Sequence, residues 1–371
     1  WKIVLLLPYP GRFHFKNKLV YLFGPIIPVF FTFRALLSPG PVVWGDAPYF
    51  YPEALEELVA GPFAWTSWGN NFGGVNHVIW LYPLMFLYGL LYTVFGWENE
   101  LLVRFIFYFP AIVLAFLSPV VFFRGLGYSK IVQFFSSLLY GLNTYFLLLI
   151  DGGQVGIALA YGIFPLTIHC LRKLQFNFTK ANFFTALLIS IALMVADPRF
   201  FVIALFTLVV WNFFNLIIFG TSKYLRQLAI LVTVLAGTVG VGFYWVIPML
   251  SLENAQGYLS NGTQFVTLLN TLFLFQPHWP ANEFGRIPPP SFYFVGIPLL
   301  ILVNFLYKSE RKTLVFFSLF LLFVFLSKGD APPFGEVYKW LTANLPFATA
   351  FRDSTKFFAP LILFAGILVA V

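Results

Sequence analysis

The chain has 371 residues, of which 60% are hydrophobic and only 10% carry a charged side chain. An ordinary soluble domain carries about 25% charged residues, so this composition excludes that class and indicates an integral membrane protein. We attribute the net charge of +8 to basic loops between membrane helices, a bias common in membrane proteins, and not to nucleic-acid binding. With one cysteine, Cys170, and four scattered histidines, the chain offers neither a disulfide framework nor a zinc site.

The first predicted membrane helix, 19–38, follows a basic N-terminal arm. A helix needs roughly 20 apolar residues to cross a hydrocarbon core of about 30 Å, and runs of this kind recur along the chain. The sequence therefore predicts an all-α polytopic protein, a single transmembrane module over 1–371. Because the chain begins at Trp1 without Met and ends at Val371 inside an apolar run, we expect the N-terminal part of a longer protein. The ten predicted spans are 19–38, 101–123, 131–149, 157–171, 181–196, 201–219, 228–248, 291–307, 313–327 and 356 onward.

A stretch with acidic but no basic residues follows the first helix, since no Lys or Arg occurs between Arg34 and Arg104. Within it, residues 52–61 predict a short amphipathic helix. Pro52 suits the first helical position, acidic side chains suit the first turn, and Gly61 follows the end. The leucines share one face and the glutamates point elsewhere, which is typical of a helix lying in the membrane interface.

The apolar run 77–96 decides the predicted topology. If it crosses the membrane, several basic loops share a side with the acidic stretch. If it only dips in or lies at the interface, one side holds fourteen bases and one acid, and the other holds thirteen acids and six bases. Because Lys and Arg mark cytoplasmic loops, we expect a plasma-membrane protein with a cytoplasmic N-terminus. Its two large extracytoplasmic loops are then 40–100 and 249–290.

Asp46 opens the first of these loops, in the sequence W-G-D-A-P, where Gly45 and Pro48 shape an irregular backbone among aromatic residues. Two interpretations remain open from the local sequence. One is a turn aspartate that accepts hydrogen bonds from its own backbone. The other is a carboxylate that works close to the membrane surface.

The order of these segments along the chain resembles that of a known protein superfamily. A basic arm, a first helix, an acid and an amphipathic helix precede L-Y-P-L-M-F-L-Y-G-L-L-Y-T-V-F-G at 81–96, then E-N-E-L-L-V-R at 98–104 and R-G-L-G-Y-S-K at 124–130. Over roughly its first 150 residues the chain thus resembles the GT-C superfamily of membrane glycosyltransferases. The later A-F-R-D-S-T-K-F-F, residues 350–358, is similar to a segment of the arabinofuranosyltransferase-like members.

The resemblance implies a GT-C-like fold and an enzyme with a polyprenyl-phosphate-linked sugar as donor. Such an enzyme transfers the sugar to a glycan, lipid or protein acceptor on the outer face of the membrane. In this superfamily an acid of the first outer loop acts as catalytic base or holds a metal, and Asp46 occupies that place. A paired Asp-x-Asp is absent because the third residue is Pro48, so a divalent cation (Mg²⁺ or Mn²⁺) stays open and no metal ligand is assigned. The nearest second acid is Glu53, a candidate for substrate binding, with the solvated face of the amphipathic helix as the alternative.

The departing phosphate of such a donor gathers negative charge and must be met by cations. Arg352 and Lys356 are four residues apart and can share a helix face, although interfacial anchoring beside Asp353 explains them as well. Arg199 could bind phosphate or pair with Asp197. The outer-side candidates for donor binding are Arg199, Arg286, Arg352 and Lys356.

Two further expectations concern the first loop. Asn76 and His77 end the polar stretch G-N-N-F-G-G-V-N-H and are candidates for contact with acceptor sugar, with a plain loop as the alternative. Glu100 and Arg104, four residues apart, are expected to form an ion pair at the membrane interface.

Two other functions remain as alternatives. A transporter or lipid flippase usually carries charges near the middle of its spanning helices and often an inverted repeat. Here the charges lie at predicted helix ends and in loops, and no inverted repeat is evident, which favours the enzyme. The third possibility is a non-catalytic membrane scaffold module.

Overall fold

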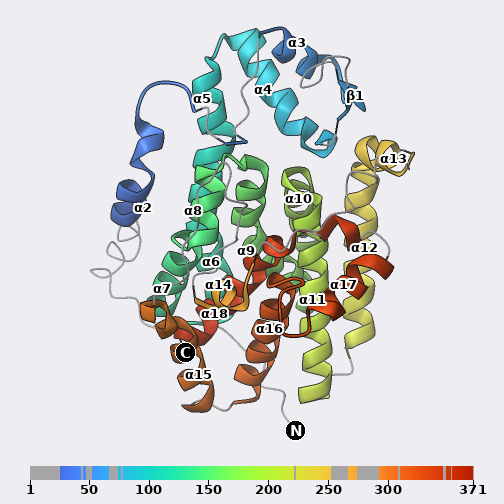
Figure 1. Ribbon diagram of the computed structural model, residues 1–371. Helices are drawn as coiled ribbons and strands as arrows, with labels where there is room; N and C mark the ends of the chain where they lie inside the picture. The colour runs from blue at the N-terminus through green and yellow to red at the C-terminus, as the bar shows by residue number, and fades with distance from the viewer. Residues whose placement is uncertain are drawn as a thin grey trace.

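The computed structural model confirms an all-α protein (Figure 1). Among the described residues, the only strands are β1 (Trp65–Thr66) and β2 (Gly74–Val75), which pair antiparallel with Trp65 opposite Val75. Most other described residues are helical. The structure describes residues 26–42, 45–46, 52–66, 74–76, 78–220, 223–251, 266–273, 292–307, 310–345, 348–351 and 353–370.

Of the helices in the first quarter of the chain, α3 and α4 lie across the top of Figure 1, whereas α2 lies on the left side of the molecule. As predicted, α3 begins at Pro52 and Gly61 follows its end. Its packing on α4 is tight, because a Cβ at Gly89 would lie 2.9 Å from the Leu55 carbonyl oxygen. These elements are α2 (Ile26–Phe33), η2 (Arg34–Leu37), α3 (Pro52–Ala60), η3 (Ile79–Leu81) and α4 (Tyr82–Phe95).

The remaining helices form a bundle that runs from α5 to α18. The first of them is continuous through a π-helical turn, so that α5, η4 and α6 make one helix, Asn99–Gly125. The bundle elements are α5 (Asn99–Val103), η4 (Arg104–Tyr108), α6 (Phe109–Gly125), α7 (Lys130–Gly141), α8 (Thr144–Asp151), α9 (Val155–Phe176), α10 (Lys180–Ala196), α11 (Pro198–Phe219), α12 (Tyr224–Val241), α13 (Phe243–Ser251), α14 (Leu268–Phe273), η6 (Phe292–Val295), α15 (Gly296–Tyr307), α16 (Arg311–Ser327), α17 (Gly335–Asn344), η7 (Ala348–Phe351), η8 (Ser354–Phe357) and α18 (Phe358–Ala370).

Four helices of the described chain are long and apolar enough to cross a membrane, and a fifth span results if α7 and α8 are counted as one. The four are Asn99–Gly125, Val155–Phe176, Pro198–Phe219 and Tyr224–Val241. Shorter apolar helices occupy other predicted spans, including Lys180–Ala196. The structure is therefore compatible with a membrane protein, whereas the number of spans stays a prediction.

Two predicted spans are broken rather than straight. The run 131–149 becomes α7 and α8, which meet at 43°, because Asn143 leaves the helical path and caps α8 by accepting from the Phe146 amide. The run 228–248 is interrupted at Gly242, where α12 ends and α13 begins. Hydropathy alone does not register either break, since the apolar character of both runs continues through it.

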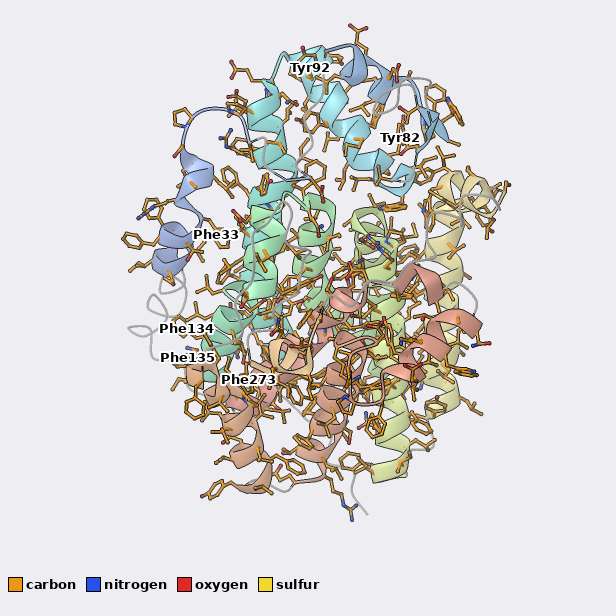
Figure 2. The ribbon with its side chains drawn as sticks, viewed as in Figure 1. Phe33, Tyr82, Tyr92, Phe134, Phe135 and Phe273 are labelled. Atoms are coloured by element: carbon orange, nitrogen blue, oxygen red, sulfur yellow. The ribbon has the colours of Figure 1, made fainter. Side chains whose placement is uncertain are left out.

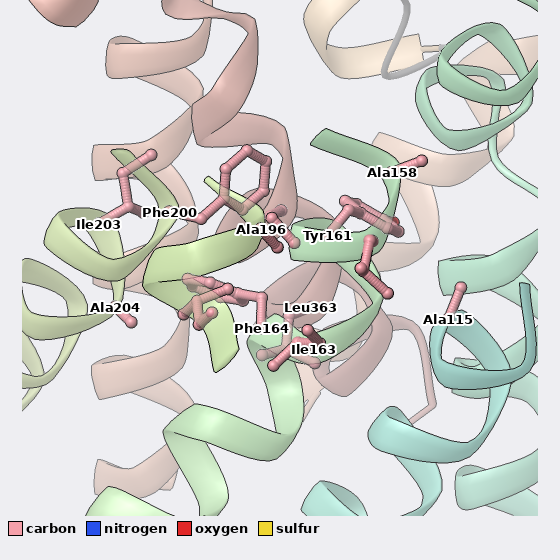
Figure 3. Packing of buried hydrophobic residues seen from close by; sticks show 14 of the residues in the cluster. Ala115, Ala158, Tyr161, Ile163, Phe164, Ala196, Phe200, Ile203, Ala204 and Leu363 are labelled. Atoms are coloured by element: carbon pink, nitrogen blue, oxygen red, sulfur yellow. The ribbon is translucent and has the colours of Figure 1, made fainter. Parts of the chain in front are cut away.

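The centre of the bundle is packed with small and aromatic side chains. Ala115 of α6, Ala158 of α9 and Ala204 of α11 lie in this cluster (Figure 3), and small residues let helix backbones approach closely. At Gly162 a Cβ would lie only 2.8 Å from the Ala111 carbonyl oxygen, so α6 and α9 touch there. The outer surface is also apolar, with aromatic side chains such as Phe135 projecting from it (Figure 2), as suits contact with lipid.

Arg104 does not form the predicted ion pair with Glu100. Its guanidinium instead donates to the carbonyl oxygens of Leu36, Ser38 and Gly40 at 2.7–2.8 Å, and to the Glu100 carbonyl at 2.8 Å. Five donors in a rigid fork suit this clustered set of acceptors. The side chain is buried, and it ties the segment after α2 to the start of the long helix.

Candidate functional site

Asp46 is docked on the turn between α8 and α9. Its amide donates to the Gly152 carbonyl at 2.8 Å, and its Oδ2 accepts from the Gln154 side chain at 3.3 Å. Gly45 has φ +57°, and a Cβ there would collide with the Gly152 carbonyl, so only glycine fits this approach. The carboxylate is exposed, and both of its described contacts go to this turn rather than to its own segment.

The other end of α8 lies beside a group of charged side chains. Tyr145, in the first turn of α8, is fully buried, and its ring stacks on Phe358 of α18 with centroids 5.2 Å apart. Its buried hydroxyl lies near the Thr355 side chain, without a hydrogen bond of good geometry among the described atoms. Sequence reasoning missed Tyr145, because nothing in a run of apolar and aromatic residues marks one tyrosine.

The first ion pair of this group caps α11. Asp197 is 1% exposed and occupies the N-cap position, where it accepts from the Arg199 amide at 2.9 Å. Arg199 Nε and Nη2 donate to the two carboxylate oxygens at 2.9 and 2.5 Å. Of the two interpretations of Arg199, pairing with Asp197 is thus confirmed, and the Arg199 side chain remains 29% exposed.

The second ion pair lies at η8, within the A-F-R-D-S-T-K-F-F segment. Lys356 is 2% exposed and lies 2.5 Å from Asp353 Oδ2. Asp353 also accepts from the Thr355 amide at 3.1 Å and from its hydroxyl at 2.6 Å. Burial disfavours the charged carboxylate, but the Lys356 ammonium and the Thr355 donors outweigh it, so that the pKa of Asp353 is lowered to about 2.

The two pairs form one cluster. The charge of Arg199 acts on both Lys356 and Asp353, and the Tyr145 hydroxyl lies within the field of both carboxylates. We call these five residues the charged cluster: Tyr145, Asp197, Arg199, Asp353 and Lys356. The structure thus brings together two of the predicted donor-binding residues, Arg199 and Lys356, from segments far apart in the chain.

Lys328 is a further buried base, one of the six outer-side bases of the sequence, although it was not assigned to donor binding. It follows α16, is 3% exposed, and donates to the Ala331 carbonyl oxygen at 2.6 Å. Burial lowers the pKa of Lys328, an effect that Asp330 opposes. The neighbouring Ser327 carbonyl accepts from Ser354 Oγ at 2.7 Å, so this lysine sits against the segment that carries the second ion pair.

A shallow groove lies between α3, the hairpin formed by β1 and β2, and the start of α4. Asn76 lines it and holds its shape, because Nδ2 donates to the Phe63 carbonyl at 3.3 Å and Oδ1 accepts from the Val78 amide at 3.2 Å. Asn76 therefore belongs to this groove and not to the charged cluster.

The other predicted site residues cannot be placed. Arg286, Arg352 and His77 lie outside the described residues, and Glu53 lies in α3 but its side chain is outside the description. Among the described residues, no three His, Cys, Asp or Glu side chains form a group that could hold a metal ion.

Comparison with known proteins returned no family model that matches the chain and no curated protein that is similar to it.

Proposed function

We propose that the protein is a membrane glycosyltransferase that takes a sugar from a polyprenyl-phosphate carrier and transfers it on the outer face of a prokaryotic plasma membrane. The single observation that carries this proposal is the placement of two groups along α8. Asp46 docks at the Gly152 end, and the charged cluster surrounds Tyr145 near the other end. At 1.5 Å per residue the two ends are separated by about 10 Å, a length comparable with that of a sugar phosphate.

The chemistry assigns a different task to each group. The acceptor hydroxyl oxygen attacks the anomeric carbon, the bond from that carbon to the phosphate oxygen breaks, and the phosphate leaves with the electron pair. Asp46 accepts the proton from the acceptor hydroxyl, a contribution typically worth about 10²–10⁴-fold in rate. Its exposure and its hydrogen bond from Gln154 leave one carboxylate oxygen to meet the acceptor.

The charged cluster supplies the cations for the phosphate. Arg199 and Lys356 carry two positive charges, and Asp197 and Asp353 hold both side chains in place by ion pairs. Buried ion pairs are costly to desolvate and often fail to stabilise a fold, and ionisable groups between membrane helices suggest a functional site. An incoming phosphate would share the two cations with the carboxylates, and the Tyr145 hydroxyl is placed to donate to it.

The proposal includes a topology. We infer that α3 and α4 lie at the outer membrane surface and that α4 does not cross, which leaves Asp46 outside. The position of α4 against α3 at one end of the bundle (Figure 1) supports this arrangement. It also supports entry of the lipid carrier from the bilayer beside the bundle.

A transporter or flippase is the second candidate, favoured by one observation. Asp197 and Lys356 of the charged cluster are buried among helices, where transporters place ionisable groups. The two functions differ in their chemistry, because a flippase moves the polyprenyl phosphate sugar across the membrane with its glycosidic bond intact.

The test uses proteoliposomes and a panel of radiolabelled polyprenyl-monophosphate sugars, with Asp46→Asn compared with Asp151→Asn. Asp151 is an exposed aspartate beside the same turn and serves as the matched control. We expect transfer to fall by at least about 10²-fold in Asp46→Asn and to remain in Asp151→Asn. Full transfer by Asp46→Asn, or lipid movement without any transfer by the wild type, contradicts the proposal.

A further inference from the structure

The groove beside α3 has the chemistry of a carbohydrate-binding site. Its floor is apolar and buried, formed by Leu58, Ile79 and Met85. Its rim carries two aromatic side chains that are largely exposed, Phe63 at 54% and Trp65 at 61%. Aromatic rings that border a hollow offer flat apolar faces on which a ligand can stack.

Polar side chains also line the groove. Glu57 supplies a carboxylate, Asn76 an amide, and Tyr82 and Thr66 supply hydroxyls. Tyr82 begins α4 (Figure 2). Ligand sites typically combine aromatic walls with a few placed polar groups, and sugars present apolar C–H faces together with hydroxyl edges. The Asn76 side chain is already fixed by the backbone on both sides of the groove, so this polar edge is preformed.

The charge around the groove excludes an anionic ligand. Of the described residues that line the groove, Glu57 is acidic and none is Lys or Arg. A phosphate, a carboxylate or an anionic lipid head group would meet this negative charge without a cation from the described lining. The occupant is therefore rich in hydroxyl groups and carries no negative charge.

The groove is also linked to the candidate base through α9. A Cβ at Gly156, in the first turn of α9, would lie 3.7 Å from Leu81 Cδ1, and Leu81 directly precedes Tyr82 of the groove. Gln154, two residues before Gly156, donates to the Asp46 carboxylate. The wall of the groove and Asp46 thus dock on the same short segment, at the start of α9.

We propose that this groove binds the neutral saccharide of the acceptor, with Trp65 stacking on a sugar ring and Glu57 accepting from its hydroxyls. The inference rests on the proposed function only in identifying the saccharide as the acceptor. Binding of a neutral saccharide is a property that can be measured without any transfer.

The test measures binding of neutral methyl glycosides, a set of pentofuranosides and hexopyranosides, by saturation-transfer NMR. The full chain is held in lipid nanodiscs, because glucoside and maltoside detergents carry sugars themselves. We expect at least one glycoside to bind, and Trp65→Ala and Glu57→Gln each to weaken it by roughly fivefold, which corresponds to about 1 kcal/mol for one contact. Methyl glucuronide, which is anionic, should not bind.

Trp97→Ala is the matched control, since Trp97 is an exposed tryptophan at the same end of the molecule but does not line the groove. Its binding should equal that of the wild type. The proposal is overturned if no neutral glycoside binds, if both groove variants bind normally, or if the glucuronide binds equally well.

Asp46→Asn separates this inference from the proposed function, because it should abolish transfer and leave glycoside binding unchanged. If the wild type binds glycosides but never transfers a sugar, the proposed function fails and the groove stands. If it transfers a sugar but the groove variants bind normally, the groove fails alone.

Discussion

At the scale of single residues, the charged cluster contains two ion pairs whose members differ in exposure. Lys356 is 2% exposed, whereas the side chain of its partner Asp353 is 35% exposed. A charge left without its partner costs most where water cannot reach it. The stability of the pair should therefore depend on which member is removed.

We predict that Asp353→Asn destabilises the protein by about 3 kcal/mol and Lys356→Met by only about 1 kcal/mol. Asp353→Asn leaves the buried Lys356 ammonium without its partner, whereas Lys356→Met leaves the Asp353 carboxylate, which is partly hydrated. Thermal unfolding in nanodiscs at pH 7 measures both, and the double variant Asp353→Asn with Lys356→Met should recover most of the loss. An equal cost for the two single variants would contradict the asymmetry.

The Asp353–Lys356 pair should also make the stability of the protein depend on pH. Because the pKa of Asp353 is lowered to about 2, its stabilising contribution is present in full above the unfolded value near 3.8 and is lost as the pH falls toward 2. The wild type should lose this contribution in that window, and Asp353→Asn should not.

At the scale of elements, the attachment of the first loop to the α8–α9 turn is the feature on which Asp46 depends. Gly45 and Gly96 both adopt positive φ, +57° and +65°. A Cβ at Gly45 would collide with the Gly152 carbonyl, whereas nothing lies within 4 Å of a Cβ at Gly96. Comparing variants at the two glycines therefore separates the effect of backbone strain from the effect of losing the contact with the turn.

We predict that Gly45→Ala lowers sugar transfer by roughly 10²-fold, the loss expected when a catalytic group moves by about 1 Å. Gly96→Ala pays the same strain of about 1 kcal/mol and should keep its activity. Transfer assays and thermal unfolding of both variants make the comparison. If Gly45→Ala were as active as Gly96→Ala, Asp46 would not need its place on the turn.

Several elements were predictable because their signals are local. Pro52 and Gly61 bound α3, and the ends of α10 and α11 follow from Lys180 and from the D-P-R turn. The break at Asn143 and the carbonyl partners of Arg104 were not predictable. Both depend on contacts that form only after packing, and hydropathy averages over single residues.

The candidate site was likewise predictable only in part. Asp46 and Lys356 were named from motif order, and the pairing of Arg199 with Asp197 from their spacing. The convergence of Arg199 with Lys356 beside Tyr145 could not be read from the sequence, because the three come from α11, η8 and α8. Of the residues that line the groove, the sequence analysis named only Asn76. Phe63 and Trp65 line it only once the chain is folded, and no local pattern marks them.

At the scale of the whole molecule, the account requires a definite orientation. Large apolar side chains cover the outside of the bundle, for example Leu225 and Leu306, which fits a surrounding bilayer. Basic loops gather at one end and the acidic first loop, with α3 and α4, at the other, as the positive-inside rule requires if α4 does not cross. Asp46 and the groove then face the exterior.

The most direct test is side-specific labelling in intact cells. Cys170 is the only cysteine, so single cysteines at Asp46 and Lys223 can be introduced in a Cys170→Ala background and treated with a membrane-impermeant maleimide. We predict that a cysteine at position 46 is labelled from outside and one at position 223 only after lysis. Protection of position 46, or labelling of position 223 in intact cells, would contradict the orientation and with it the proposed sugar transfer.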